Sequence, residues 1–219
     1  MNAVMETQST RAQHKEQFRK QILSGAREMF VQEGYERFSM RKLASKIGCS
    51  AGGLYLYFEN KEELFQTLVE ETFQRLTTLL TGLCSRNEGK DPIELLKKAL
   101  YTYVDFGLRN ANDYRFTFLL SQPTEQECAK IPPPVAVLGK IVERCSEEGR
   151  LRDVHPEVVT QALWASVHGI TSLFIQRPSY PWAEKAKVAE HLIANAVAGL
   201  VLVRDTQEMP VMAAQAAVA

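Results

Sequence analysis

Residues 39–58 read SMRKLASKIGCSAGGLYLYF, and the interpretation of the whole chain begins with this stretch. Its first half carries apolar residues at helical spacing, namely Met40, Leu43, Ala44 and Ile47. Ser39 can cap that helix and Gly48 can end it. Ser50 can then cap a second short helix over residues 51–58. Two short helices joined by a tight turn are typical of a helix-turn-helix, whose second helix enters the major groove of DNA.

The side chains around this turn are suited to a polyanion. A serine at a helix N-terminus offers a hydroxyl beside free backbone N–H groups, which together favour a phosphate oxygen. Basic and phenolic side chains on the outer faces can meet further phosphates, and the start of the second helix is placed to read bases. The predicted DNA contacts are Ser39, Arg41, Lys42, Ser50, Ala51, Gly52, Gly53, Leu54, Tyr55, Tyr57 and Lys61.

The charge distribution points the same way. The 219 residues carry 26 basic and 26 acidic side chains, so the formal net charge is zero. Residues 10–47, however, hold nine Lys or Arg and four Asp or Glu. A basic segment on a neutral protein indicates a local polyanion-binding region, although a solvated basic face would have the same composition.

Outside this stretch the sequence predicts one helix after another. An apolar stripe predicts a helix over residues 15–33 that ends at Gly34, and Asn60 with Glu63 forms a capping box for a helix over 61–80. Asp91 followed by Pro92 is a strong helix start. Further helices are expected over 91–108, 113–120, 135–148, 155–177 and 182–203. No stretch shows the alternation of a half-buried strand, so the predicted fold class is all-α with about nine helices.

Residues 18–68 resemble the N-terminal domain of the TetR/AcrR family of bacterial transcriptional regulators. The stretches that carry the resemblance are ILSGAREMFVQEGYERFSMRKLASKIGCS and AGGLYLYFENKEELF. Further on, WASVHG resembles a signature of the WHG-type C-terminal domains of that family. One departure is Gly53, where relatives usually carry Thr or Ser. The glycine removes a hydroxyl and lowers helix propensity by about 1 kcal/mol relative to alanine, which puts the base contacts in doubt but not the fold.

The resemblance implies an all-helical homodimer that binds a pseudo-palindromic DNA operator and releases it when a small molecule binds. It implies a DNA-binding domain over residues 1–62, in which 1–14 form a flexible arm. A ligand-binding and dimerisation domain would follow over 63–204, and 205–219 would be a flexible tail. The partners expected are operator DNA, a second copy of the chain and an effector, with no membrane, no cofactor and no metal.

The last two long helices are apolar on more than one face, which requires burial all round. Since no membrane signal accompanies them, a subunit interface is the economical explanation, and a central core helix is the alternative. The predicted interface residues are Ala162, Ala165, Gly169, Leu192, Ala196, Gly199 and Leu200.

Aromatic residues gather in the middle of the C-terminal half, where they can line a cavity for a lipophilic or aromatic compound. The predicted ligand contacts are Tyr103, Phe106, Tyr114, Phe118, Leu138, Ile141, Trp164 and His168. The alternative is that most of them are ordinary core. His168 can either orient a ligand or hydrogen-bond a neighbouring helix.

Several functional classes are disfavoured. The polar N-terminus does not resemble a signal peptide, and the longest apolar run, 196–203, is well short of the about 20 residues of a membrane span. The four cysteines form no CxxC pair, which favours reduced thiols in the cytoplasm. HExxH, GxSxG, GxxxxGK and GxGxxG motifs are absent, so an enzyme is not expected. A Cys–His pair could still form between His168 and Cys128 or Cys145.

The sequence thus predicts a one-component repressor. Two alternatives remain open: a ligand-binding protein or enzyme on a degenerate regulator scaffold, for which Gly53 is the only support, and an activator with the same fold.

Overall fold

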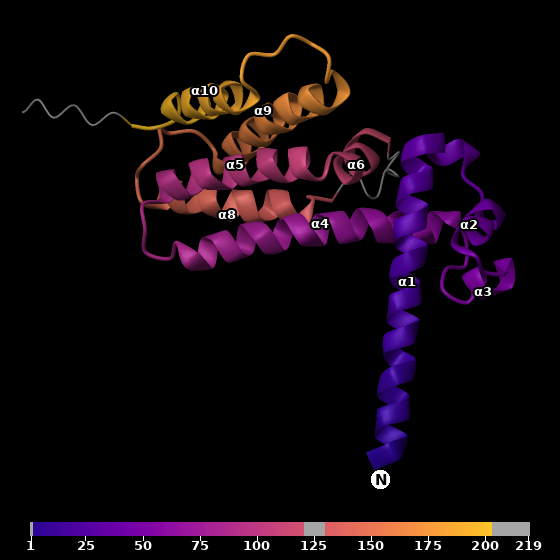
Figure 1. Cartoon of the computed structure of the whole chain (residues 1–219). Coiled ribbons are helices and arrows are strands. Elements are labelled where there is room, and N and C mark those ends of the chain that lie inside the picture. The colour runs from indigo at the N-terminus through magenta and orange to yellow at the C-terminus, as the bar shows by residue number, and fades with distance from the viewer. Residues whose placement is uncertain (1, 121–129, 203–219) are drawn as a thin grey trace, which may run out of the picture.

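The computed structural model describes residues 2–120 and 130–202 of the protein (Figure 1). These residues form nine α-helices and one short π-helix, which confirms the all-α expectation. In chain order they are α1 (Asn2–Arg37), α2 (Met40–Ile47), α3 (Ala51–Tyr55), α4 (Lys61–Arg86), α5 (Pro92–Arg109), α6 (Ala111–Tyr114), the π-helix η1 (Arg115–Leu120), α8 (Pro133–Glu147), α9 (Pro156–Gln176) and α10 (Lys185–Ala198).

The capping residues expected from the sequence set most helix ends. Gly34 has φ of 79° and kinks α1, and Gly48 has φ of 75° and ends α2. Asn60 accepts from the N–H of Glu63 at 2.8 Å. The Glu63 carboxylate in turn accepts from the N–H of Glu59 at 2.6 Å, which completes the capping box one residue earlier than a standard one.

Several helix boundaries differ from the prediction, among them the end of α4, which lies at Arg86 and not near residue 80. The helix α1 begins at Asn2 and not near residue 15, so residues 2–14 are helical, and no Gly or Pro interrupts the chain before Gly25. The helix α3 ends at Tyr55 and not near residue 58, since two glycines weaken this short helix. The helix α10 ends at Ala198, after which Val201 pairs with Leu151. The predicted tail over 205–219 lies outside the described residues.

The long helix α4 belongs to both halves of the molecule (Figure 1). Its first turns pack in a hydrophobic core with α1, α2 and α3. Its last turns pack against α5 and α8 in a second core, in which α5 also contacts α9 and α10. In Figure 1, α1 runs crosswise to α4 near the junction of the two halves, and α6 lies beside it.

One aromatic side chain crosses from the second half into the first. Phe116, in η1, is 1% exposed and belongs to the N-terminal core. Its ring centroid lies 4.3 Å from that of Phe65 and 5.5 Å from that of Phe30. The η1 segment therefore anchors the C-terminal bundle in the core of the helix-turn-helix half.

The helix α9 is long and apolar enough to cross a membrane by length and composition alone. Half of its most apolar window is buried against the rest of the chain, chiefly α5, α8 and α10. A core helix of a globular domain has these properties, so they are weak evidence for a membrane span.

Two glycines give a matched test of packing at the centre of the bundle. A Cβ at Gly107 in α5 would lie 2.4 Å from Thr171 Cγ2 and 2.9 Å from the Tyr114 ring, whereas at Gly82 in α4 it would meet only the flexible end of Arg86, at 3.3 Å. We therefore expect Gly107→Ala to lower the free energy of unfolding in urea by about 1–3 kcal/mol. Gly82→Ala should raise it by about 0.5–1 kcal/mol, and equal effects of the two substitutions would contradict this packing.

Candidate DNA-binding surface and ligand pocket

The helix-turn-helix is held from beneath by apolar contacts. Leu43 and Ala44 of α2 are buried in the N-terminal core together with Leu54 of α3. At the turn, the Gly48 N–H bonds to the last carbonyls of α2, and the Ser50 hydroxyl accepts from the Gly53 N–H at 3.0 Å. Buried side chains and caps therefore fix both helices, and their opposite faces remain in solvent.

Several predicted DNA contacts lie on that outer face. Arg41 and Lys42 are exposed on α2, and Gly52 and Tyr55 are exposed on α3. The Lys42 ammonium lies 2.9 Å from the Glu33 carboxylate, so it has a partner that a phosphate would replace. Ser39 makes no capping bond with its hydroxyl, which leaves this group available to a ligand.

The remaining predicted contacts are less accessible. Leu54 is fully buried, so its predicted role in reading bases is wrong: it lies on the inner face of α3. Tyr57 is half-buried with its ring edge-on to Phe18, at 5.2 Å between centroids. The half-buried Lys61 ammonium lies 4.1 Å from the centroid of the Tyr35 ring, a cation–π contact.

The first residues of α3 have small side chains or none. Ala51 and Gly53 are half-buried, and Ser50, although exposed, uses its hydroxyl as the helix cap. A Cβ at Gly53 would lie 3.2 Å from Ser50 Oγ, so a larger residue there requires the cap to shift by a few tenths of an ångström. Backbone and small side chains therefore form the predicted base-reading edge.

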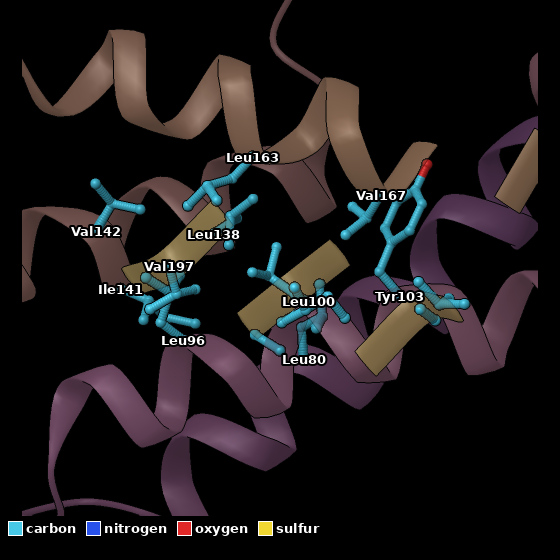
Figure 2. Close-up of a cluster of buried hydrophobic side chains, with 14 of the residues drawn as sticks. Leu80, Leu96, Leu100, Tyr103, Leu138, Ile141, Val142, Leu163, Val167 and Val197 are labelled. Carbon is cyan, nitrogen blue, oxygen red and sulfur yellow. The ribbon is translucent and has the colours of Figure 1, made fainter. Parts of the chain in front are cut away.

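A cavity lies between α4, α5, α8 and α9. Its empty volume, including the part open to solvent, is about 270 Å³. It is lined by Leu80, Ala99, Leu100, Tyr103, Pro134, Val135, Leu138, Trp164 and Val167. Figure 2 shows Leu80 and Leu100 in the middle of the cluster of buried side chains, with Tyr103 and Val167 to the right of them. Of the eight predicted ligand contacts, Tyr103, Leu138 and Trp164 line the cavity.

Three further predicted contacts form a cluster beside it. The Tyr114 hydroxyl lies 2.6 Å from His168 Nδ1, and the Tyr103 hydroxyl lies 3.1 Å from the same nitrogen. The ring of Phe118 packs 4.7 Å from that of Tyr114. Phe106 and Ile141 are buried in the core and do not line the cavity, so their packing supports the alternative of ordinary core residues.

Burial keeps this polar cluster neutral. Desolvation lowers the pKa of His168 and raises the pKa of Tyr103 to about 12. The pKa of Tyr114 is raised as well, first by burial and then by the neighbouring Tyr103. At neutral pH the cluster is therefore a set of uncharged hydrogen-bonding groups in an apolar surrounding.

The helix α9 has an exposed apolar stripe. Val158 and Leu173 are 57% and 48% exposed, and Ala162 and Ala165 between them are exposed as well. At Gly169 an added Cβ would meet open space. The interface residues predicted on α10 and directly after it are less exposed: Leu192, Ala196 and Leu200 are half-buried against the C-terminal core, whereas Gly199 is exposed.

An ionic cluster at the junction of the two halves was not found from the sequence. Asp113, whose side chain is 10% exposed, lies 2.5 Å from Arg27 of α1 and 2.6 Å from Arg75 of α4. Glu71 lies 3.5 Å from Arg27 and 3.4 Å from Arg19. The sequence does show charged residues within the apolar stripes of these helices, which could have indicated buried ion pairs. Their spacing, however, does not indicate that a residue of α1 contacts a residue of α6.

The cysteine thiols give little support to a nucleophilic site. Cys145 is fully buried, and desolvation raises the pKa of its thiol to about 11, which disfavours the reactive thiolate. Cys128 lies outside the described residues. Within the part of the chain that the structure describes, no three His, Cys, Asp or Glu side chains are grouped to hold a metal ion.

The buried imidazole predicts a pH dependence of stability. Since burial lowers the folded pKa of His168 below the unfolded value near 6.5, its contribution to stability is complete above that pH and declines as the pH falls. We expect wild type to lose more free energy of unfolding than His168→Gln between pH 7.5 and 5.5, measured by urea denaturation. Parallel pH profiles for the two proteins would contradict a buried neutral imidazole.

Two family models match the chain. Residues 22–68 match "Bacterial regulatory proteins, tetR family", and residues 96–196 match "Tetracyclin repressor-like, C-terminal domain". Together they span about two thirds of the chain, the helix-turn-helix in the first match and most of the cavity in the second.

Individual relatives extend this similarity. The nucleoid occlusion factor SlmA of Haemophilus ducreyi is 32% identical over 36% of this chain, a match that spans 38% of SlmA. The HTH-type transcriptional repressor AcnR of Corynebacterium efficiens is 28% identical over 70% of this chain and 80% of its own. The chain thus aligns with less than half the length of the first of these curated relatives and with four fifths of the second.

Solved structures share the fold. NalD of Pseudomonas aeruginosa, the secondary repressor of the MexAB-OprM multidrug efflux pump, superposes with a TM-score of 0.68 and 22% identity over 88% of this chain and 99% of its own. From the two family models and this shared fold it follows that the chain belongs to the TetR family of bacterial regulatory proteins.

Proposed function

We propose that the protein is a cytoplasmic transcriptional repressor that binds a pseudo-palindromic operator as a homodimer and is released by a small apolar effector. The observation that carries the proposal is the helix-turn-helix whose inner face is fixed in a core and whose outer face presents Arg41, Lys42 and Tyr55. The repressor names of AcnR and NalD agree with it. The helices α1 to α3 form the DNA-binding part, and α4 continues from it into the effector-binding part.

Phosphate contacts supply most of the affinity in this proposal. Arg41, Lys42 and the free hydroxyl of Ser39 lie at one edge of the helix-turn-helix and are suited to backbone oxygens. Because the start of α3 carries few hydrogen-bonding side chains, close backbone approach and DNA shape contribute much of the specificity.

The effector acts through a physical link between cavity and DNA-binding helices. Leu80 of α4 lines the cavity, and Leu64 and Leu68 of the same helix lie in the N-terminal core. A ligand releases DNA only if it binds the non-binding conformation better, so it must favour a different position of α4 or of the η1 anchor.

Dimerisation accounts for the exposed stripe on α9. Small side chains at Ala162, Ala165 and Gly169 allow close helix approach, and Val158 and Leu173 supply apolar area at the two ends. A two-fold symmetric contact along α9 and α10 would cover this stripe and place two reading helices on one operator.

Charge reversal on α2 tests DNA binding. We expect Arg41→Glu with Lys42→Glu to lower affinity for a selected operator by at least about tenfold and to flatten its salt dependence, because phosphate contacts are lost. The control with the same charge change is Lys98→Glu with Lys140→Glu, on α5 and α8, which should retain wild-type affinity. The operator would be selected from random duplex DNA, where an inverted repeat is expected. If both double variants bind alike, the proposed surface is wrong.

A bulky charge on α9 tests the interface. Ala165→Arg places a charge within the proposed contact, and we expect the dimer dissociation constant to rise by at least about a hundredfold in sedimentation equilibrium. Ala136→Arg makes the same change at an exposed alanine of α8 and should leave the dimer intact. A dimer that withstands Ala165→Arg but not Ala136→Arg would move the interface to α8.

A further inference from the structure

The apolar cavity contains one hydrogen-bond donor that nothing satisfies. Trp164 lines the cavity, and its indole Nε1 is buried without a hydrogen-bond partner among the described residues. The nearby indole of Trp164 lowers the pKa of the Tyr103 phenol, although burial raises it more, but the two groups do not meet the geometry of a hydrogen bond. A buried donor without an acceptor is destabilising, so an acceptor at this position would be stabilising.

The neighbouring polar groups bond to one another, and none of them accepts a hydrogen bond from this donor in the structure. His168 Nε2 lies 3.4 Å from the Ser172 hydroxyl, and the Tyr114 hydroxyl lies 2.6 Å from His168 Nδ1. The Tyr103 hydroxyl is 3.2 Å from that of Tyr114. With the proton of neutral His168 on Nε2, each hydroxyl of the two tyrosines donates to the next member of the chain. The Trp164 N–H is the one donor of this group that takes no part in the series of hydrogen bonds.

The other lining side chains restrict the charge of an occupant. Tyr103 is the only ionisable residue among them, and burial holds its pKa near 12, so it is neutral. His168, the nearest imidazole, is kept neutral by burial. Among the described residues that line the cavity, neither an anion nor a cation would find a counter-charge, and the cost of desolvating it would oppose binding.

We infer that this cavity binds small, uncharged, largely apolar molecules that carry one acceptor oxygen, a ketone or a similar carbonyl, and that this oxygen accepts from Trp164 Nε1–H beside the Tyr103 hydroxyl. The inference rests on the proposed function in taking this cavity as the effector site. The space that is open in this structure is narrow, so a compound of one ring with a short substituent enters only when the lining side chains move apart, and a long chain requires the helices themselves to separate.

Three probes of similar size separate the parts of the inference. Acetophenone is neutral with a carbonyl acceptor, ethylbenzene lacks the acceptor, and benzoate carries a charge. Each would be titrated into the full-length ¹⁵N-labelled protein while the indole N–H signals are followed by NMR. The chain has two tryptophans, and Trp182 is an internal reference because its Nε1–H already donates to the Arg177 carbonyl at 2.9 Å.

With acetophenone, we expect the Trp164 indole N–H signal to move downfield and the Trp182 signal to stay in place. Ethylbenzene should bind without that downfield shift, and benzoate should bind at least about tenfold more weakly than acetophenone. Trp164→Phe, which assigns the signal and removes the donor, should weaken acetophenone about fivefold and ethylbenzene little.

Each other result overturns the inference. If acetophenone binds without moving the Trp164 signal, or if Trp164→Phe weakens both neutral probes equally, the donor has no role. If benzoate binds as well as acetophenone, the site is not selective for neutral ligands. If acetophenone does not bind up to its solubility, the cavity does not take this class. Operator binding measured on the same preparation separates these results from failure of the proposed function, which would abolish DNA binding in the absence of any probe.

Discussion

The structure depends on the way one short segment, α6 with η1, is fastened into the DNA-binding half. Asp113 lies between Arg27 of α1 and Arg75 of α4, and the ring of Phe116 packs against those of Phe30 and Phe65. A carboxylate with a side chain only 10% exposed is tolerated because two guanidinium groups surround it. Without this anchor, α4 would be the main connection between the two cores.

This anchor places the cavity and the reading helices in one mechanical unit. Tyr114, next to Asp113, bonds to His168 of α9, and Tyr103 beside it lines the cavity. A compound that displaces Tyr103 therefore acts on a chain of contacts that ends at α1, in addition to acting on α4. Closely packed cores adopt alternative arrangements and do not deform continuously. A small shift at the cavity can therefore be sufficient to reorient the DNA-binding helices α1 to α3.

Features encoded locally were predictable from the sequence. The glycines at 34 and 48, the caps at Ser50, Asn60 and Asp91, and the apolar stripes fixed the helix order and the helix-turn-helix. Each depends on residues within a few positions of one another, so one sequence is sufficient to identify them.

What the sequence could not reveal depends on which helices meet. Leu54 carries no mark that separates the inner from the outer face of a five-residue helix, and its place became clear only from its burial in the N-terminal core. The same holds for Phe116. Its place in the sequence predicts that it packs in the C-terminal core, but its ring lies in the N-terminal core. Among the predicted ligand contacts, periodicity could not separate Tyr103 and Trp164, which line a cavity, from Phe106 and Ile141, which fill the core.

The central claim is that the η1 anchor makes the helices α1 to α3 and the C-terminal helix bundle open as one cooperative unit. Native-state hydrogen exchange of wild type and Phe116→Ala tests it most directly. In wild type, the slowest amides of α1 and α5 should report the same free energy of opening. In the variant, the value for α1 should fall by about 3–5 kcal/mol while that for α5 is retained. Unchanged protection of α1, or an equal fall in both helices, would contradict the account.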